Sequence, residues 1–228
     1  MITRSYRTDF PGIDILCRGI RKEASKIDKE LLITQMEQQM HHKMSTYMRN
    51  RIIEQAQHVK LKKGTHPIHE GDELTHLYWI EKGIVRGFYI NSEGEEVTKC
   101  FSSEGGYFGS EGLRGGGQAT FHVECLEECS CIAMPYGLVR EMIDKDLHIY
   151  NYMTSLFMKE VTRLERRTRN LLLLDAEERY QSFLADYPAL EGRVKLCYIA
   201  SYIGIHPGSL SRIRKVKQSP KEKEKRKN

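Results

Sequence analysis

Near its C-terminal end the chain carries side chains that suit the recognition of nucleic acid. The guanidinium of Arg212 presents donors in the geometry that matches a base edge in a major groove, and the ammonium of Lys215 suits a phosphate. The residues predicted to face outward here are His206, Pro207, Gly208, Ser209, Ser211, Arg212 and Lys215. Their chemistry predicts hydrogen bonds to base edges together with neutralisation of phosphates.

The elements that must position these side chains are two helices joined by a tight turn, over residues 196–215. Ala200 is small enough for two helices to meet closely, and Gly204 admits the left-handed backbone of a sharp turn. Pro207 suits the first turn of the second helix. The apolar seam between the helices consists of Ile199, Ile203, Ile205, Leu210 and Ile213. This spacing predicts a helix-turn-helix.

A packed helical hairpin without a nucleic-acid partner is the alternative for this segment, because an alternation of Ile and Gly is not specific. The charge favours DNA: residues 214–227 hold eight Lys or Arg against two Glu. Residues 217–228 form a basic, low-complexity tail that we expect to be disordered. This tail adds either phosphate affinity or only solubility.

Length and composition fit a soluble protein with one sizeable core and a smaller second unit. The 228 residues are 39% hydrophobic and 29% charged, with a net charge of +5. No apolar run approaches the ~20 residues of a membrane span, and residues 1–20 lack the apolar core of a signal peptide. We therefore expect a cytoplasmic protein with no membrane partner.

The cysteines are scattered without a paired framework, at Cys17, Cys100, Cys125, Cys129, Cys131 and Cys197. In a reducing cytoplasm they are expected to be free thiols. Three of them cluster within residues 125–131, in strand-like sequence and without a C-x-x-C pair, which favours small fillers of a sheet core. A thiol-based redox sensor is the alternative.

Between residues 59 and 134 the hydrophobic period changes from helical to roughly two, with glycine turns between short strands. The predicted strands are 77–80, 84–90, 97–101, 121–126 and 130–134. This spacing is typical of a small antiparallel β-barrel or jelly roll. His66 and His69 are predicted to face opposite sides of a strand, which argues against a shared metal. Helical periodicity precedes this region over residues 27–57, with Ser45 as an N-cap.

A long helical run follows the β-rich region. Positions spaced alternately by four and three form a predicted coiled-coil dimer seam of Tyr150, Thr154, Phe157, Val161, Leu164 and Thr168. Met153, Leu156 and Met158 are expected to widen its apolar side toward the barrel. Asp175 and Glu178 predict a capping box at the start of the next helix. A long helix packed only on its own barrel is the alternative to a dimer.

The order of these motifs resembles the Crp/Fnr family of bacterial transcription regulators. The motifs are Lys62-Lys63-Gly64 with Gly71-Asp72, the hairpin from Tyr78 to Arg86, Phe108-Gly109, the long helix and the terminal helix-turn-helix. The resemblance covers about residues 27–215. It implies a cyclic-nucleotide-binding-like barrel and a homodimer with a parallel helix pair. It also implies double-stranded DNA with an approximately palindromic promoter site as partner, and RNA polymerase as a further one.

The resemblance also implies an effector pocket, with Phe108, Gly109, Ser110, Glu111, Ala119 and Thr120 as its candidate residues. In cyclic-nucleotide-responsive members a Gly-Glu pair holds the ribose, and an Arg-Ser or Arg-Thr pair neutralises the phosphate. Here Ser110 takes the Glu position, Glu111 comes one place late, and Ala119 takes the Arg position. A buried phosphate without a counter-charge is costly. We therefore expect that cyclic AMP is not bound in the usual way.

No cofactor is identifiable, and a small-molecule effector of unknown identity is the expectation for the barrel. Only Cys17 precedes Cys100, which excludes the N-terminal cysteine cluster of the family's iron–sulfur oxygen sensors. No motif identifies a metal site or a catalytic residue, so we expect no enzymatic activity.

The predicted fold class is α+β, with a jelly-roll barrel, a long dimerisation helix and a small helical domain. The predicted division is an extension over 1–25, a sensor-like barrel over 26–140, the dimerisation helix over 141–174, the helix-turn-helix domain over 175–216 and the tail over 217–228. A sequence-specific DNA-binding regulator is the expected function. The alternative is a ligand-binding or cupin-like barrel whose helical appendage does not bind DNA, although the His-x-His of cupin metal sites does not occur.

Overall fold

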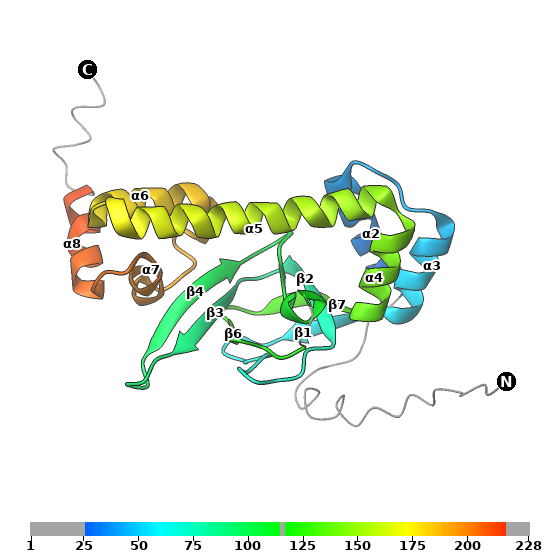
Figure 1. The fold of residues 1–228 in the computed structure, drawn as a ribbon, viewed down its shortest axis with the longest axis horizontal. Coiled ribbons are helices and arrows are strands. Elements are labelled where there is room, and N and C mark those ends of the chain that lie inside the picture. The colour runs from blue at the N-terminus through cyan, green and yellow to red at the C-terminus, as the bar shows by residue number, and fades with distance from the viewer. Residues whose placement is uncertain (1–25, 115–116, 218–228) are drawn as a thin grey trace, which may run out of the picture.

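A computed structural model describes residues 26–114 and 117–217 (Figure 1), so the predicted N-terminal extension and all but the start of the basic tail lie outside the described residues. Its helices are α2 Lys26–Met40, α3 Thr46–Gln55, α4 Tyr136–Lys145, α5 Leu147–Leu173, α6 Ala176–Asp186, α7 Leu196–Ile203 and α8 Pro207–Lys217, with short 3-10 turns η1 Glu111–Arg114 and η2 Pro188–Leu190. Its strands are β1 Gln57–Leu61, β2 His76–Lys82, β3 Val85–Ile90, β4 Glu96–Ser102, β5 Tyr107–Phe108, β6 His122–Cys125 and β7 Cys129–Pro135.

The strands form two antiparallel sheets. One has the order β1-β7-β2-β5 and the other the order β4-β3-β6. The five strands predicted from the period of two overlap β2, β3, β4, β6 and β7. The antiparallel sheets and the helical segments of the predicted fold are therefore confirmed. The pairings among the described residues make two sheets and do not by themselves show a closed barrel.

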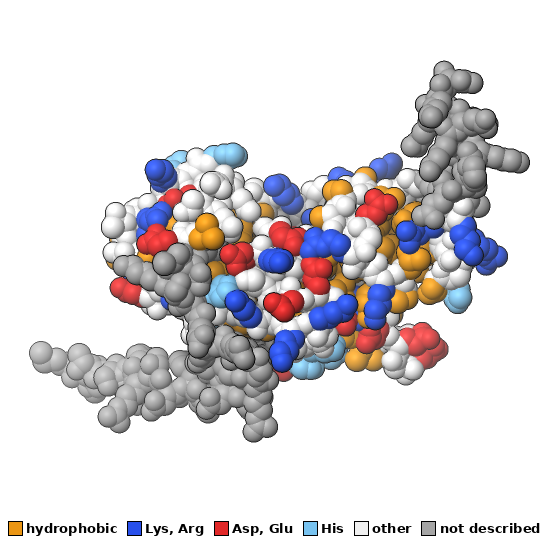
Figure 2. Space-filling model, turned by 180° about the vertical axis from the view of Figure 1, so that it is seen from behind, with side chains coloured by type: hydrophobic (Ala, Val, Ile, Leu, Met, Phe, Trp, Pro, Cys, Tyr) orange, Lys and Arg blue, Asp and Glu red, His pale blue; other side chains and the backbone are white. Residues whose placement is uncertain are grey.

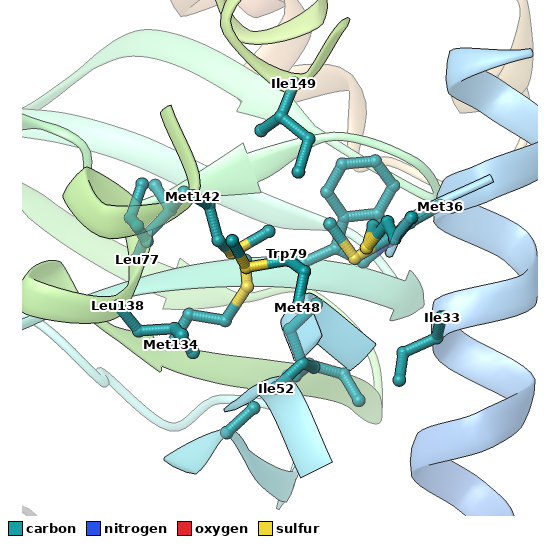
Figure 3. Close-up of a cluster of buried hydrophobic side chains, with 14 of the residues drawn as sticks. Ile33, Met36, Met48, Ile52, Leu77, Trp79, Met134, Leu138, Met142 and Ile149 are labelled. Atoms are coloured by element: carbon teal, nitrogen blue, oxygen red, sulfur yellow. The ribbon is translucent and has the colours of Figure 1, made fainter. Parts of the chain in front are cut away.

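Helices α2, α3, α4 and the start of α5 cover the four-stranded sheet and share one hydrophobic core with it (Figure 3). Met48 and Ile52 of α3 point into this core, to which Trp79 of β2 also belongs. Ser45 is the N-cap of α3, as predicted, because its side chain accepts a hydrogen bond from the Met48 amide. This end of the molecule is thus held by burial of apolar side chains.

Helix α5 runs along the molecule from this N-terminal helical group to the C-terminal helices α6, α7 and α8 (Figure 1). Asp146 begins it by accepting hydrogen bonds from the amides of His148 and Ile149. At the far end the predicted capping box is confirmed, because Asp175 and Glu178 bond reciprocally at the start of α6. Met158 is 57% exposed, so the prediction that it faces the barrel is wrong.

His66 and His69 do not face opposite sides as predicted, because their segment is a loop with an isolated bridge at Ile68 and lacks a strand's alternation. Their ring centroids lie 5.9 Å apart. Even so, residues 26–114 and 117–217 contain no group of three or more His, Cys, Asp or Glu that could hold a metal ion.

The surface opposite the view of Figure 1 carries Lys and Arg side chains interspersed with Asp and Glu (Figure 2). Among the helices in the described part of the chain, none is long and apolar enough to cross a membrane.

Candidate nucleic-acid interface

Helices α7 and α8 meet at a sharp turn that begins at Gly204. This residue adopts a left-handed conformation with φ +68° and ψ 44°, which favours glycine. The Ile205 amide donates back to the Ala200 carbonyl at 3.0 Å, and a Cβ on Gly204 would lie 3.0 Å from the Leu171 side chain. Ala200 and Leu210 are fully buried between the helices. The small residue and the glycine thus have the structural roles that their spacing predicts.

The residues predicted to face outward all lie on or just before α8. Exposed side chains belong to His206, Pro207, Arg212 and Lys215 together with the backbone of Gly208, whereas Ser209 and Ser211 are half-buried. The Gly208 amide donates to His206 Nδ1 at 3.1 Å, which orients the imidazole at the start of the helix. The structure therefore brings the candidate donors onto one solvent-facing helix.

The C-terminal helices share a hydrophobic core with the three-stranded sheet, a contact that the sequence interpretation missed. Phe101 of β4 packs edge-on against Phe183 of α6 and Tyr187, with ring centroids 6.0 and 5.8 Å apart. Ile84 and Leu126 belong to the same core. Helices α6, α7 and α8, the C-terminal unit, are therefore docked on the three-stranded sheet.

Polar contacts align helix α7 with strand β4. The Thr98 amide donates to Ser201 Oγ at 2.9 Å. From α5, the Arg167 guanidinium donates to the carbonyls of Thr98, Lys99 and Tyr202 at 3.0, 2.7 and 3.0 Å. Arg167 also stacks on the Tyr202 ring, 4.3 Å from its centroid. One side chain thus joins the long helix, the barrel and the C-terminal unit.

Arg86 of β3 is 1% exposed, and it lies between the rings of Phe88 in the barrel and Tyr198 in α7, at 4.4 and 3.8 Å from their centroids. Its charge is compensated by hydrogen bonds to Glu124, at 2.9 Å, and to Glu96. Arg86 is the last residue of the hairpin motif from Tyr78 to Arg86. That motif did not predict that α7 covers the Arg86 side chain.

Arg193, between η2 and α7, forms a second ionic contact with the barrel. It bonds to Glu104 at 2.7 Å and to Glu127. The hydrogen bond from Arg193 is the main cause that lowers the pKa of Glu104 to about 2. This cation therefore ties two barrel loops to the segment that leads into α7.

In the predicted effector loop, the donors of Thr120 are occupied by a carboxylate of the chain itself. Glu111 accepts hydrogen bonds from the Thr120 hydroxyl at 2.5 Å and from its amide at 3.2 Å. Ala119 is buried, and Phe108 is buried beside Gly109, which has φ +77°. The Glu111 carboxylate thus takes the position in which Thr120 could hold an anion.

A cavity of about 370 Å³ opens next to this loop, between the sheet, α5 and η2. Lys99, Lys159 and Arg163 contribute cations to its lining, and Glu104 and Glu160 contribute carboxylates. Four of the six predicted effector residues also line it, namely Phe108, Gly109, Ser110 and Glu111, whereas Ala119 and Thr120 are not among its walls. An effector site at this cavity stays a prediction.

The predicted dimer seam is largely solvent-facing on the described chain. Tyr150, Val161 and Leu164 are 49%, 45% and 40% exposed, and Thr154 and Thr168 are also exposed. Phe157 differs from these residues. It is half-buried, with its ring 5.8 Å from that of Tyr107, so it belongs at least partly to the core of its own barrel. Because large apolar side chains rarely face water in a row, the remaining stripe suits a helical partner.

Comparison with known proteins agrees with this architecture. Residues 58–146 match the cyclic nucleotide-binding domain family. The cAMP-activated global transcriptional regulator CRP of Haemophilus influenzae is 27% identical over 113 residues, which are 49% of this chain and 50% of that protein. The fumarate and nitrate reduction regulatory protein of Vibrio cholerae is 26% identical over 124 residues, covering 54% and 49%. The chain is thus similar to Crp/Fnr regulators over about half of its length.

The solved structure of FixK2 from Bradyrhizobium japonicum resembles this chain in fold, with a TM-score of 0.63 at 18% identity. The match covers 70% of this chain and 83% of that one. The chain spans about half the length of the curated relatives it matches. Both of those relatives are regulatory proteins by name, and neither name describes an enzyme.

Proposed function

We propose that the protein is a homodimeric, sequence-specific DNA-binding transcription regulator. The observation that carries the proposal is the exposed face of α8, on which Arg212 and Lys215 lie beside a helix start held by the left-handed turn at Gly204. In this proposal α7 and α8 act as a helix-turn-helix and α8 enters the major groove. Arg212 is the main reader of base edges, and the remaining outward residues approach bases and phosphates.

Two copies pair through the exposed stripe of α5. A two-fold axis along this helix would place two α8 helices on one side of the DNA, about one helical turn apart, on an approximately palindromic site. The docking of α7 on β4 supports the proposal physically, because it fixes the direction of α8 relative to α5. Contact with RNA polymerase is the further step that relationship to transcription regulators implies.

The barrel does not bind cyclic AMP in the usual way in this proposal. The carboxylate of Glu111 already accepts the Thr120 donors, and Ala119 supplies no cation. A phosphate at this position would meet a negative charge rather than a counter-ion. Titration calorimetry of the reduced protein with cyclic AMP tests this, and we expect no saturable heat; binding that is abolished by Thr120→Ala would contradict it.

The proposed function is tested by selecting duplexes from a random DNA pool with the purified protein, without ligand and at moderate salt. We expect enrichment of an inverted repeat whose half-sites are about one helical turn apart. Enrichment of a single unrepeated site would refute the dimer geometry. Binding without any sequence preference would refute α8 as a base-reading helix and leave only electrostatic attraction.

A further inference from the structure

The cavity of about 370 Å³ lies where three parts of the chain meet. Strands β3 and β4 supply one wall, α5 supplies a second, and the end of α6 with Tyr187 and η2 supplies a third. Its volume is within the roughly 300–1,000 Å³ that small-molecule sites occupy. A molecule bound here would therefore contact the sheet, the long helix and the C-terminal unit at once.

Two cations of α5 lie on the same side of this cavity. Lys159 and Arg163 are four positions apart, so they occupy one face of the helix, and both line the cavity. Lys159 is exposed and forms no ion pair with another described residue. Arg163 donates from Nη1 to Glu160 at 2.7 Å, and its remaining N–H groups can serve a further acceptor. This face of α5 suits an anionic group.

Tyr187 brings a buried hydroxyl next to Arg163. Tyr187 is 7% exposed, and its hydroxyl oxygen has no hydrogen bond of normal geometry with any described residue. The Arg163 guanidinium lies over the Tyr187 ring, 4.9 Å from its centroid. Because a buried hydroxyl without a partner is unfavourable, it suits an acceptor atom that a ligand brings.

The sheet side of the cavity is largely apolar. Phe101, Phe108 and Phe121 line it, and Leu156 of α5 does so as well. All three phenylalanines are buried. An apolar ligand body that leaves water to pack against these rings gains free energy. The lining thus combines anion-binding donors on α5 and at Tyr187 with an apolar surface on the strands.

We propose that this cavity binds a small monocarboxylic acid with an apolar body. The carboxylate accepts hydrogen bonds from Lys159, Arg163 and the Tyr187 hydroxyl, and the apolar body packs on the phenylalanine rings. A phosphate dianion is disfavoured, because the same lining holds four carboxylates, namely Glu104, Glu111, Glu160 and Asp186. The bound acid leaves Ala119 and Thr120 untouched, since neither lines the cavity.

The test is to titrate the purified full chain with octanoate and with 4-phenylbutyrate, using ligand-observed saturation-transfer NMR. We expect saturable binding of at least one acid. Octan-1-ol, which lacks the charge, and octyl phosphate, which carries a second one, should bind about tenfold more weakly than octanoate. No saturable binding of either acid would overturn the proposal. Equal affinity for the alcohol, or tighter binding of the phosphate, would overturn the monocarboxylate as ligand class.

Tyr187→Phe removes only the hydroxyl. Affinity for the acid should fall about tenfold, because a hydrogen bond to a charged group is lost. The thermal midpoint of the ligand-free variant should equal or exceed that of the parent chain, since the hydroxyl has no partner to lose. A lower midpoint in the absence of ligand, or unchanged affinity, would refute the role of this hydroxyl.

Lys159→Gln should weaken binding about threefold, less than Tyr187→Phe, because solvent screens an exposed ammonium. The matched control is Lys60→Gln, which removes an exposed cation from β1, a strand that does not line the cavity. It should keep the affinity of the parent chain. Equal losses in the two lysine variants would show that surface charge attracts the acid and that α5 does not hold it.

A bound acid should also tighten the C-terminal unit against the sheet, because Asp186 of α6 and Leu190 of η2 line the same cavity as β4. Amide exchange in residues 186–190 and 196–203 should slow at saturating acid, and unchanged exchange would refute this link. The consequence for DNA, a fixed direction of α8, rests on the proposed function. Because titration and exchange need no DNA, failure of the proposed DNA binding leaves both tests intact.

Discussion

Arg212 is an exposed side chain whose guanidinium only weakly contacts its own helix, through a hydrogen bond from Nε to the Gly208 carbonyl at 3.4 Å. Breaking that contact to reach a base costs little. We predict that Arg212→Ala loses about 1–3 kcal/mol of affinity at the selected site and relaxes preference at one base position. Fluorescence anisotropy with the selected duplex and its single-base variants measures both effects.

The matched control is Lys60→Ala, which removes one exposed cation from β1, on the four-stranded sheet. It should leave base preference unchanged. If Arg212→Ala kept both affinity and preference, α8 would not read bases through this residue.

The carboxyl of Glu104 couples pH to the docking of the C-terminal unit. Its pKa is about 2 in the folded chain, lower than the usual 4.5, because Arg193 hydrogen-bonds to the charged form. A lowered folded-state pKa contributes stability above the ordinary value, and that contribution is lost as pH falls toward about 2. For Glu104→Gln we predict that the midpoint of thermal unfolding falls less between pH 4.5 and pH 2 than it does for the parent chain.

Both Glu104 and Arg193 are about one-third exposed, so solvent screening keeps this effect small. Glu93→Gln, in an exposed turn, should retain the parent profile. Identical acid profiles for the parent and Glu104→Gln would show that the ion pair does not contribute to stability.

At the scale of elements, α5 has one side packed on the core of the four-stranded sheet and one stripe facing water. Met153 is buried in the N-terminal core, whereas Val161 and Leu164 are exposed. We predict that Val161→Asp with Leu164→Asp gives monomers, because two charges per helix would be forced into an apolar seam. Analytical ultracentrifugation measures the oligomeric state.

Thr162→Asp is the matched control, because Thr162 is also exposed and lies one position from Val161 on the same helix. It should leave the dimer intact. Phe157 is unsuitable for this test, since it also packs against Tyr107 and its replacement would disturb the barrel. Dimers of the double variant would rule out the assigned seam.

At the scale of the whole molecule, three arginines hold the C-terminal helices against the sheets: Arg86 of β3, Arg167 of α5 and Arg193 in the segment before α7. Arg167 donates hydrogen bonds to three backbone carbonyls, two in β4 and one in α7. We predict that Arg167→Met weakens docking by about 1.5–3 kcal/mol, the contribution expected for charge-assisted hydrogen bonds. Hydrogen exchange should become faster in α7 and β4.

Arg169→Met is the control for this prediction, because Arg169 lies two residues further along α5 and is exposed. It should leave exchange in both elements unchanged. Equal exchange in the two variants would show that the apolar core around Phe101 and Phe183 holds the units together without Arg167.

Local structure could be predicted from the sequence because its causes lie within a few residues. Ser45 and Asp175 cap helices through their own neighbours, and Gly204 permits the turn by its lack of a Cβ. Alternation of apolar residues likewise located five of the seven strands in the described part of the chain, and it missed β1 and β5. The prediction for His66 and His69 was wrong because it assumed a strand where tertiary contacts make a loop.

The sequence by itself therefore determined the antiparallel sheets, the long helix and the glycine turn beneath an outward basic face. Only the tertiary structure decided that α7 lies on β4 and that Glu111 occupies the donors of Thr120. Thr98 and Ser201, for example, are 103 positions apart. Hydrophobic periods and capping motifs relate residues only a few positions apart. Contacts between distant residues depend on how the formed helices and strands pack against each other, which local helix or strand propensity does not determine.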